Sequence, residues 1–226
     1  MRTIASFKTA CLIALTVAMT SSLAGTRKDL EAAMSHDGLQ KTSVKGLDLA
    51  YALPGASLAA YKRIRLDPVD VEFDKAWDPT RTGSWIKLTS EEREKIRANV
   101  AKLVEEEFAR ELQKDGTYQI AIESAPDVLR VKVSILDLYL NAPSDTGAGR
   151  SRTYIRSAGR MTLLADLSDS ASGQILARVA DHREADSIAR TERANRLVNE
   201  DAAREVAGAW ARILRKALDK AHTIGS

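Results

Sequence analysis

The sequence has almost no cysteine and very little histidine. Cys11 is the single cysteine among 226 residues, and the three histidines are His36, His182 and His222. A lone cysteine cannot close a disulfide within the chain, and zinc sites need several Cys, His or carboxylate ligands at close spacing. The sequence offers neither a cysteine pair nor a His-x-x-x-His pair. We therefore expect no disulfide, no metal site and no cofactor, and we assign no catalytic residue.

Long hydrophobic runs are also missing. The apolar stretch at residues 10–19 is too short to span a bilayer, which needs about 20 apolar residues. Arg2 and Lys8 precede it, and the short segment Ser22-Leu23-Ala24 follows it. This layout is typical of a secretory signal that is cleaved after Ala24. We expect residues 1–24 to be a signal peptide and the mature chain to be periplasmic. The alternative is a buried N-terminal helix of a cytosolic protein.

The residue that would carry a lipid is absent as well. Leu23-Ala24-Gly25 matches the end of a bacterial lipoprotein signal, in which the next residue is a cysteine, but here it is Thr26. A hydroxyl group cannot form the thioether that holds the lipid, and Cys11 would leave with the signal peptide. We predict no stable membrane anchor, although the protein could still associate with the outer membrane without lipid. An outer-membrane lipoprotein is the alternative that a cysteine at position 26 would support.

The chain also lacks a strong excess of charge of either sign. It has 34 basic and 31 acidic residues, and removing Arg2 and Lys8 with the signal leaves 32 basic residues against the same 31 acidic ones. Binding to nucleic acid or to an anionic membrane surface depends on a basic footprint. We therefore expect neither nucleic acid nor an anionic membrane as a partner.

What the sequence does contain is a series of alternating strands and one-sided helices. Thr89 and Glu92 have the spacing of a capping box, and an apolar stripe follows over residues 90–114. A second amphipathic helix is expected over residues 200–221. Alternation of apolar and polar residues predicts strands at 61–73 with a bulge at Pro68, at 118–123, 128–140 and 153–167, and from 175 onward.

This element order predicts an α+β fold. Two one-sided helices and a half-polar sheet bury their apolar faces most simply when both helices pack on one face of the sheet. We expect an antiparallel sheet of about four to five strands, in the order strand, helix, strands, helix, with its other face open. Residues 25–60 lack a sustained pattern and are expected to be a partly ordered lead-in. Residues 61–226 are expected to form a single domain.

Three segments carry a resemblance to a known family. They are YALPGASLAAYKRIRLDPVDVEF at 51–73, APDVLRVKVSILDL at 125–138 and AGRMTLLADLSDSASGQILARVADHREA at 158–185. Together with the Trp-containing helix at the C-terminus, they resemble DUF3313, a bacterial family of unknown function whose members are often lipoproteins. The resemblance implies export in a Gram-negative cell and an envelope-associated role, but it brings no activity and no catalytic residues. Thr26 departs from the family, because such members have the lipid-bearing cysteine there.

A loop between two tryptophans is the candidate recognition surface. Trp77 and Trp85 flank a segment that contains Arg81. Aromatic and arginine side chains are favoured at the energetic centres of protein interfaces. We therefore name Trp77, Arg81 and Trp85 as a candidate surface for a partner. The alternative is that the two tryptophans close an edge of the core.

No set of residues in the sequence has the spacing of a catalytic site. Asp145-Thr146-Gly147 matches the aspartic protease signature but has no second copy. Asp181 and His182 are strand neighbours and should point to opposite faces. The acidic run 105–107 is expected to be a solvated helix face. We predict a non-catalytic, envelope-associated binding or accessory module whose partner is an unknown envelope protein or peptide. The alternative is a hydrolase or ligand-binding enzyme whose site includes Asp145 and His182.

Overall fold

The computed structural model describes residues 27–78, 89–140, 157–186 and 196–224. The expected signal peptide at residues 1–24 lies outside these ranges. In chain order the elements are α1 (Arg27–Met34), β1 (Gln40–Thr42), β2 (Leu49–Ala52), β3 (Arg63–Leu66), β4 (Asp70–Phe73), α2 (Ser90–Gln113), the 3₁₀ turn η2 (Lys114–Gly116), β5 (Gln119–Ile120), β6 (Val128–Leu140), β7 (Ser157–Asp169), β8 (Ile175–Asp186) and α3 (Arg196–Ile224).

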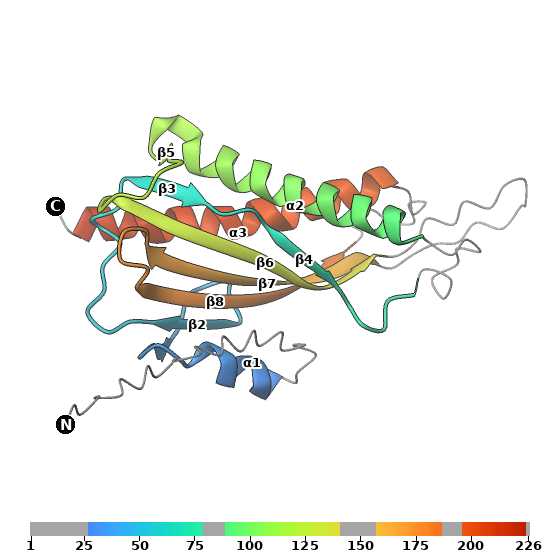
Figure 1. Cartoon of the computed structure of the whole chain (residues 1–226), viewed down its shortest axis with the longest axis horizontal. Coiled ribbons are helices and arrows are strands. Elements are labelled where there is room, and N and C mark those ends of the chain that lie inside the picture. The colour runs from blue at the N-terminus through green and yellow to red at the C-terminus, as the bar shows by residue number, and fades with distance from the viewer. Residues whose placement is uncertain (1–26, 79–88, 141–156, 187–195, 225–226) are drawn as a thin grey trace, which may run out of the picture.

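Eight strands form one mixed sheet (Figure 1). Its order is β1-β2-β8-β7-β6-β3-β5, and β4 also pairs with β6. The long strands β6, β7 and β8 are antiparallel neighbours, whereas β3 and β4 run parallel to β6 and β5 runs parallel to β3. The α+β class is as expected. The expectation of a purely antiparallel sheet with four to five strands is wrong in both direction and strand number.

The parallel pairs follow from the position of α2 in the chain. Between β4 and β6 the chain passes through α2 and β5. A crossover of this length brings the next long strand back in the direction of the first, whereas a tight hairpin reverses it. The turn between β7 and β8 is such a hairpin, in which the N–H of Asp169 donates to the carbonyl of Gln174.

Pro68 divides the strand expected at 61–73 into β3 and β4. Both parts remain beside β6, and the N–H of Asp67 still donates to the carbonyl of Val131 at 3.0 Å. Proline has no N–H to continue the ladder. The next free donor, the N–H of Val69, is bound by the carboxylate of Glu105 at 2.8 Å. The segment is therefore two short strands held between β6 and α2 and not a single bulged strand.

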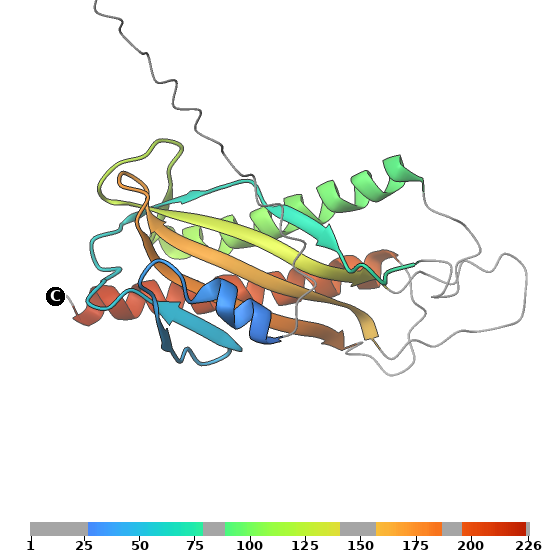
Figure 2. The same ribbon diagram turned by 60° about the horizontal axis from the view of Figure 1, so that its bottom comes forward.

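Both long helices pack against each other and against one face of the sheet, as the turned view shows (Figure 2). The capping box of α2 is confirmed, because the N–H of Glu92 donates to the Thr89 hydroxyl at 3.1 Å and the N–H of Thr89 donates to the Glu92 carboxylate at 2.7 Å. The core between helices and sheet is made of apolar side chains from α2 (Val104, Phe108, Leu112), α3 (Ala207, Trp210, Ala211, Leu218), β6 (Leu129, Val131, Val133, Ile135) and β7 (Met161, Leu163, Ala165, Leu167).

One acidic residue of α2 lies inside the contact between the helices. Glu107 is buried, and its carboxylate pairs with Arg110 on α2 and, at 3.2 Å, with Arg204 on α3. Gly208 of α3 lies next to this carboxylate, at a distance where an added Cβ would make an ordinary contact of 3.6 Å with a Glu107 oxygen. The acidic run 105–107 is therefore not a uniformly solvated face. Its last residue is an internal link between the two helices.

A bulge shifts the pairing of β6 with β7 near the end of β6. Asp137 has a φ of 52°, and the register slips between Leu136 and Tyr139. Opposite the bulge, Gly159 has a φ of 155°, and a Cβ there would lie 2.5 Å from the carbonyl oxygen of Tyr139. An extra residue reverses which face the following side chains occupy. The bulge thus places Leu138 in the core after Ile135.

The segment expected as a lead-in contributes to the same sheet. β2 pairs with β8, and α1 lies against the sheet face opposite α2 and α3 (Figure 2). A small second core, formed by Met34, Leu39, Leu49, Tyr51 and Ala180, joins these elements. The second face of the sheet is therefore partly covered by α1. Over its remaining part, at β3 and β6, no further element of the described ranges packs against it.

Candidate interaction surface

The uncovered part of the second sheet face is lined by charged side chains. We call it the open face and define it by the strand residues Arg63, Arg65, Arg130, Lys132 and Ser134, together with the acids Asp67, Asp70 and Asp127. The strand residues alternate with core residues such as Ile64, Leu129 and Val131. Alternation along a strand sends successive side chains to opposite faces. The pattern that buries one face therefore displays the cations on the other.

Two arginines share one carboxylate at the centre of the open face. Arg65 of β3 and Arg130 of β6 are paired in register. Arg130 contacts Asp67 through Nε at 2.8 Å and Nη2 at 2.6 Å, and Arg65 Nε lies 3.5 Å from the same carboxylate. Hydrogen bonding to Asp67 raises the pKa of Arg130. Since one carboxylate balances only one of the two guanidinium groups, the centre has an excess positive charge.

Exposure differs between these partners. The Asp67 side chain is 15% exposed, against 24% for Arg65 and 41% for Arg130. Arg65 Nη1 also donates to the Ser124 hydroxyl at 2.6 Å, which holds its guanidinium near the β5–β6 loop. The acid therefore lies beneath the two cations. A partner approaching the centre would meet the guanidinium groups first.

Exposed acids flank this centre at both ends. Arg63 forms a two-point contact with Asp127, through Nε at 2.8 Å and Nη2 at 2.5 Å. Such forked pairs fix geometry as well as charge. The hydrogen bonds from Arg63 hold the pKa of the Asp127 carboxyl below its usual value. At the other end, Lys132 Nζ lies 3.9 Å from Asp70, whose side chain is 68% exposed.

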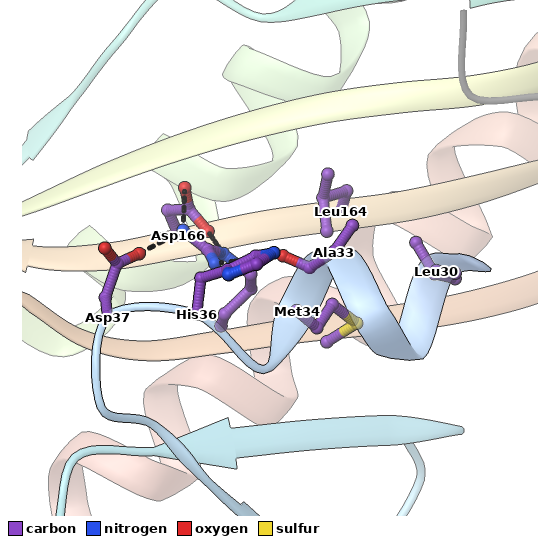
Figure 3. A pocket seen from close by; sticks show the side chains of 8 residues that line it. Leu30, Ala33, Met34, His36, Asp37, Leu164 and Asp166 are labelled. Carbon is purple, nitrogen blue, oxygen red and sulfur yellow. Dashed lines mark hydrogen bonds and ion pairs between the residues drawn. The ribbon is translucent and has the colours of Figure 1, made fainter. Parts of the chain in front are cut away.

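A hollow of about 340 Å³ lies beside α1, next to the open face (Figure 3). Its apolar lining comes from Leu30, Ala33 and Met34 of α1 and from Leu164 of β7. At its polar end Arg178 donates to Asp166 at 2.6 Å, to Asp37 at 3.2 Å and to the carbonyl of Ala33 at 3.3 Å.

The polar groups at this end of the hollow are bonded to one another in the structure. Burial opposes the charge of Arg178, but the hydrogen bonds and charges of Asp166 and Asp37 outweigh it and raise the Arg178 pKa. Three of its nitrogens contact α1, the following turn or β7. The arginine therefore fastens α1 to the sheet.

Among the predicted recognition residues, Trp77 falls within the described ranges. Trp77 is 5% exposed, its ring stacks on Phe73 at a centroid distance of 4.3 Å, and its Nε1 donates to the carbonyl of Leu140 at 2.8 Å. Its ring is therefore part of the interior and is not offered to a partner. Arg81 and Trp85 lie outside the described residues, so their part in a recognition surface stays a prediction.

Asp181 and His182 point to opposite faces, as the strand pattern predicts. Asp181 is buried toward α3, where it accepts hydrogen bonds from Trp210 Nε1 at 2.8 Å, Arg183 Nε at 2.5 Å and the N–H of Asp48 at 3.0 Å. The exposed His182 has its Nδ1 3.0 Å from the hydroxyl of Thr162. The two side chains are not brought together. Asp145, the other member of the hydrolase hypothesis, lies outside the described residues.

Across residues 27–78, 89–140, 157–186 and 196–224, no three His, Cys, Asp or Glu side chains are grouped to hold a metal ion. Within the same ranges no helix combines the length and the hydropathy that crossing a membrane requires.

The sequence patterns did not single out the open face. The alternation in RIRL at 63–66 and in RVKV at 130–133 was visible and placed these cations on one side of each strand. The alternation does not give the strand register, which sets Arg65 beside Arg130. Parallel pairing between strand residues 65 positions apart in the chain leaves no local signal.

Comparison with solved structures shows broad likenesses at low sequence identity. PelC from Paraburkholderia phytofirmans, solved as a dodecamer, has 12% identity and a TM-score of 0.40, with 80% of this chain and 95% of that chain covered. Protein XCC0632 from Xanthomonas campestris has 14% identity and a TM-score of 0.43, with 75% and 93% covered. A minor lipoprotein from Acinetobacter baumannii has 11% identity and a TM-score of 0.33, with 69% and 94% covered.

No curated protein matches the chain. A family model does, over residues 28–214, which is most of the sequence and includes every described strand. The resemblance seen in the three sequence segments is thereby confirmed. The chain belongs to DUF3313, a family of proteins of unknown function.

Proposed function

We propose that this protein is an exported, non-catalytic binding or accessory module of the cell envelope. In this proposal it contacts a protein or peptide partner through the open face. The observation that carries the proposal is the arrangement of the sheet. Both long helices occupy one face, while the other displays Arg63, Arg65, Arg130 and Lys132 from hydrogen-bonded strands. A rigid, charged surface of this kind suits recognition by contact.

The strands hold these side chains firmly. β6 pairs with β7 on one side and with β3 and β4 on the other, so its backbone is fixed along most of its length. Side chains on rigid elements lose less conformational freedom on binding than side chains on loops. The open face is therefore pre-organised for a partner of matching shape.

Export is supported by the N-terminal sequence. The basic residues, the apolar stretch and the small residues before Gly25 form the layout of a cleavable signal. The mass of the chain purified from a periplasmic fraction tests this part, and we expect a mature N-terminus at Gly25. Recovery of the uncleaved chain from the cytosol would contradict it.

Photo-crosslinking tests the binding surface. A benzophenone-bearing amino acid replaces Ser134, which lies on the open face of β6, in the chain expressed in its own cells. A second chain has the same group in place of Lys102 on the outer side of α2, where the side chain is 76% exposed. We expect one reproducible polypeptide adduct from position 134, displaced by unlabelled protein, and none from position 102. Adducts of equal yield at both positions, or none at 134, would contradict the proposal.

A further inference from the structure

We infer that the partner of the open face is a protein surface with carboxylates at its centre and basic side chains at its edges. This inference rests on the proposed function and names the chemistry of its partner. It follows from the order of charges along β3 and β6 and from which of those charges reach solvent.

The centre of the open face favours a carboxylate. Arg65 and Arg130 lie side by side above the single carboxylate of Asp67. Within the described residues, Nη1 of Arg130 and Nη2 of Arg65 have no hydrogen-bond partner. Guanidinium groups prefer planar oxygen pairs that accept two hydrogen bonds. Two neighbouring guanidinium groups with unused N–H donors and one excess positive charge suit the carboxylate of an aspartate or glutamate side chain.

The ends of the open face disfavour a uniform polyanion. Asp127, 44% exposed, stands beyond Arg63 at one end, and Asp70, 68% exposed, stands beside Lys132 at the other. A lipid surface or an anionic polymer would bring negative charge onto these acids together with the central arginines, and like charges brought together cost binding energy. A protein surface can alternate its charges, with acids opposite the arginines and lysine or arginine opposite Asp70 and Asp127.

The test uses the chain with the photoreactive group in place of Ser134. In one variant, Arg65→Gln and Arg130→Gln remove the central cations. In the matched control, Lys95→Gln and Lys102→Gln remove two exposed cations from the outer side of α2. Thermal unfolding of each purified variant checks that it folds. A third variant, Arg65→Lys and Arg130→Lys, keeps the charge if the neutral pair fails to fold.

We expect the yield of the polypeptide adduct to fall about tenfold in the neutral pair and to stay unchanged in the control. The lysine pair should keep part of the yield, because it keeps the charge but loses the forked geometry. The peptide in the adduct should contain Asp or Glu. Reversing that acid to lysine should abolish the adduct, and combining the reversal with Arg130→Glu should restore it.

The possible failures separate the two proposals. An adduct whose yield is the same in the neutral pair and in the control leaves the binding module in place and overturns the charge assignment. An adduct with lipid or glycan in place of polypeptide also overturns it. The absence of any adduct at position 134 overturns the proposed function itself, and the inference with it.

Discussion

At the scale of single residues, three aspartates have different roles because of what surrounds each of them. Asp67 lies beneath two arginines on the open face, and Asp181 is buried against Trp210. Asp137 occupies the bulge of β6, where no described residue donates a hydrogen bond to it. Burial raises the pKa of the Asp137 carboxyl, and the nearby charge of Asp74 raises it further. These three aspartates are chemically identical in the sequence. Their surroundings decide whether the residue stabilises the fold, as Asp181 does, supports exposed arginines, as Asp67 does, or lies in a strained strand, as Asp137 does.

Asp137→Asn should stabilise the protein at neutral pH. A carboxyl whose folded pKa lies above its unfolded value of 3.8 is destabilising when ionised, so its protonated form is favoured in the fold. Asparagine removes the charge and tolerates the positive φ of this position. Urea unfolding at several pH values should show a gain at pH 7 that disappears once the pH falls below 3.8. A gain that persists at low pH would contradict the electrostatic cause.

Gly159→Ala should destabilise the fold strongly. The added Cβ would meet the Tyr139 carbonyl at 2.5 Å, and the φ of 155° is unfavourable for any side chain. Strain of this kind costs on the order of 2–3 kcal/mol. The control is Gly173→Ala in the β7–β8 turn, where φ is 76° but no atom lies within 4 Å. Its expected cost is only about 1 kcal/mol. Equal losses in denaturant unfolding would mean that the contact with Tyr139 does not matter.

Trp210→Phe should cost more stability than Trp77→Phe. Both changes delete an indole N–H from a buried ring, but Trp210 donates to the carboxylate of Asp181 and Trp77 donates to the carbonyl of Leu140. Hydrogen bonds to a charged group contribute about 1.5–3 kcal/mol, and those to a neutral group about 0.5–1.5 kcal/mol. Denaturant unfolding of the two variants compares them directly. A reversed order would contradict the role given to Asp181.

At the scale of the elements, features that depend on residues close together in the sequence could be predicted. Features that depend on pairing between distant segments could not. The spacing of Thr89 and Glu92 predicted the start of α2, and alternation predicted the inward side of β6. Alternation is the same in parallel and antiparallel strands, so it could not show that β3 and β4 run parallel to β6. The burial of Glu107 was also invisible, because it depends on a helix about 100 residues later in the chain.

The capping box sets the first turn of α2. Thr89→Ala removes the hydroxyl that accepts the N–H of Glu92 and should lower the free energy of unfolding by about 1 kcal/mol. Ser90→Ala, one residue inside the helix, is the matched control and should be close to neutral. Thermal unfolding of both variants distinguishes a lost cap from a general effect of alanine at the helix end.

At the scale of the whole molecule, the structure has two cores of unequal size. The large one joins α2 and α3 to the sheet, whereas the small one joins α1, Leu39 and β2 to β8. Only four residue pairs link β2 to β8, and the Arg178 contacts add a polar link from β8 to α1 and its following turn. The partial cover of the second face was not foreseen, because residues 25–60 have no sustained period that would reveal a packed element.

A smaller core implies that the N-terminal elements open separately. We expect amide hydrogen exchange to be faster in residues 27–52 than in β6 and β7, because few buried contacts hold them. Arg178→Gln should speed exchange in α1 further while leaving β6 unchanged. Mass-spectrometric exchange of the folded protein measures both. Equal protection of all these segments would mean that the two cores unfold as one unit.

The short strands at the edges of the sheet affect how copies of the molecule can associate. β1, β4 and β5, which each pair with a single described strand, are three, four and two residues long. Asp48 directly precedes β2, and its carboxylate accepts a hydrogen bond from the N–H of His182 on β8. Edge strands this short offer another chain few unpaired backbone N–H and C=O groups with which to pair. Concentrated solutions should consequently resist fibril formation, and any assembly should proceed by flat surfaces laid against one another.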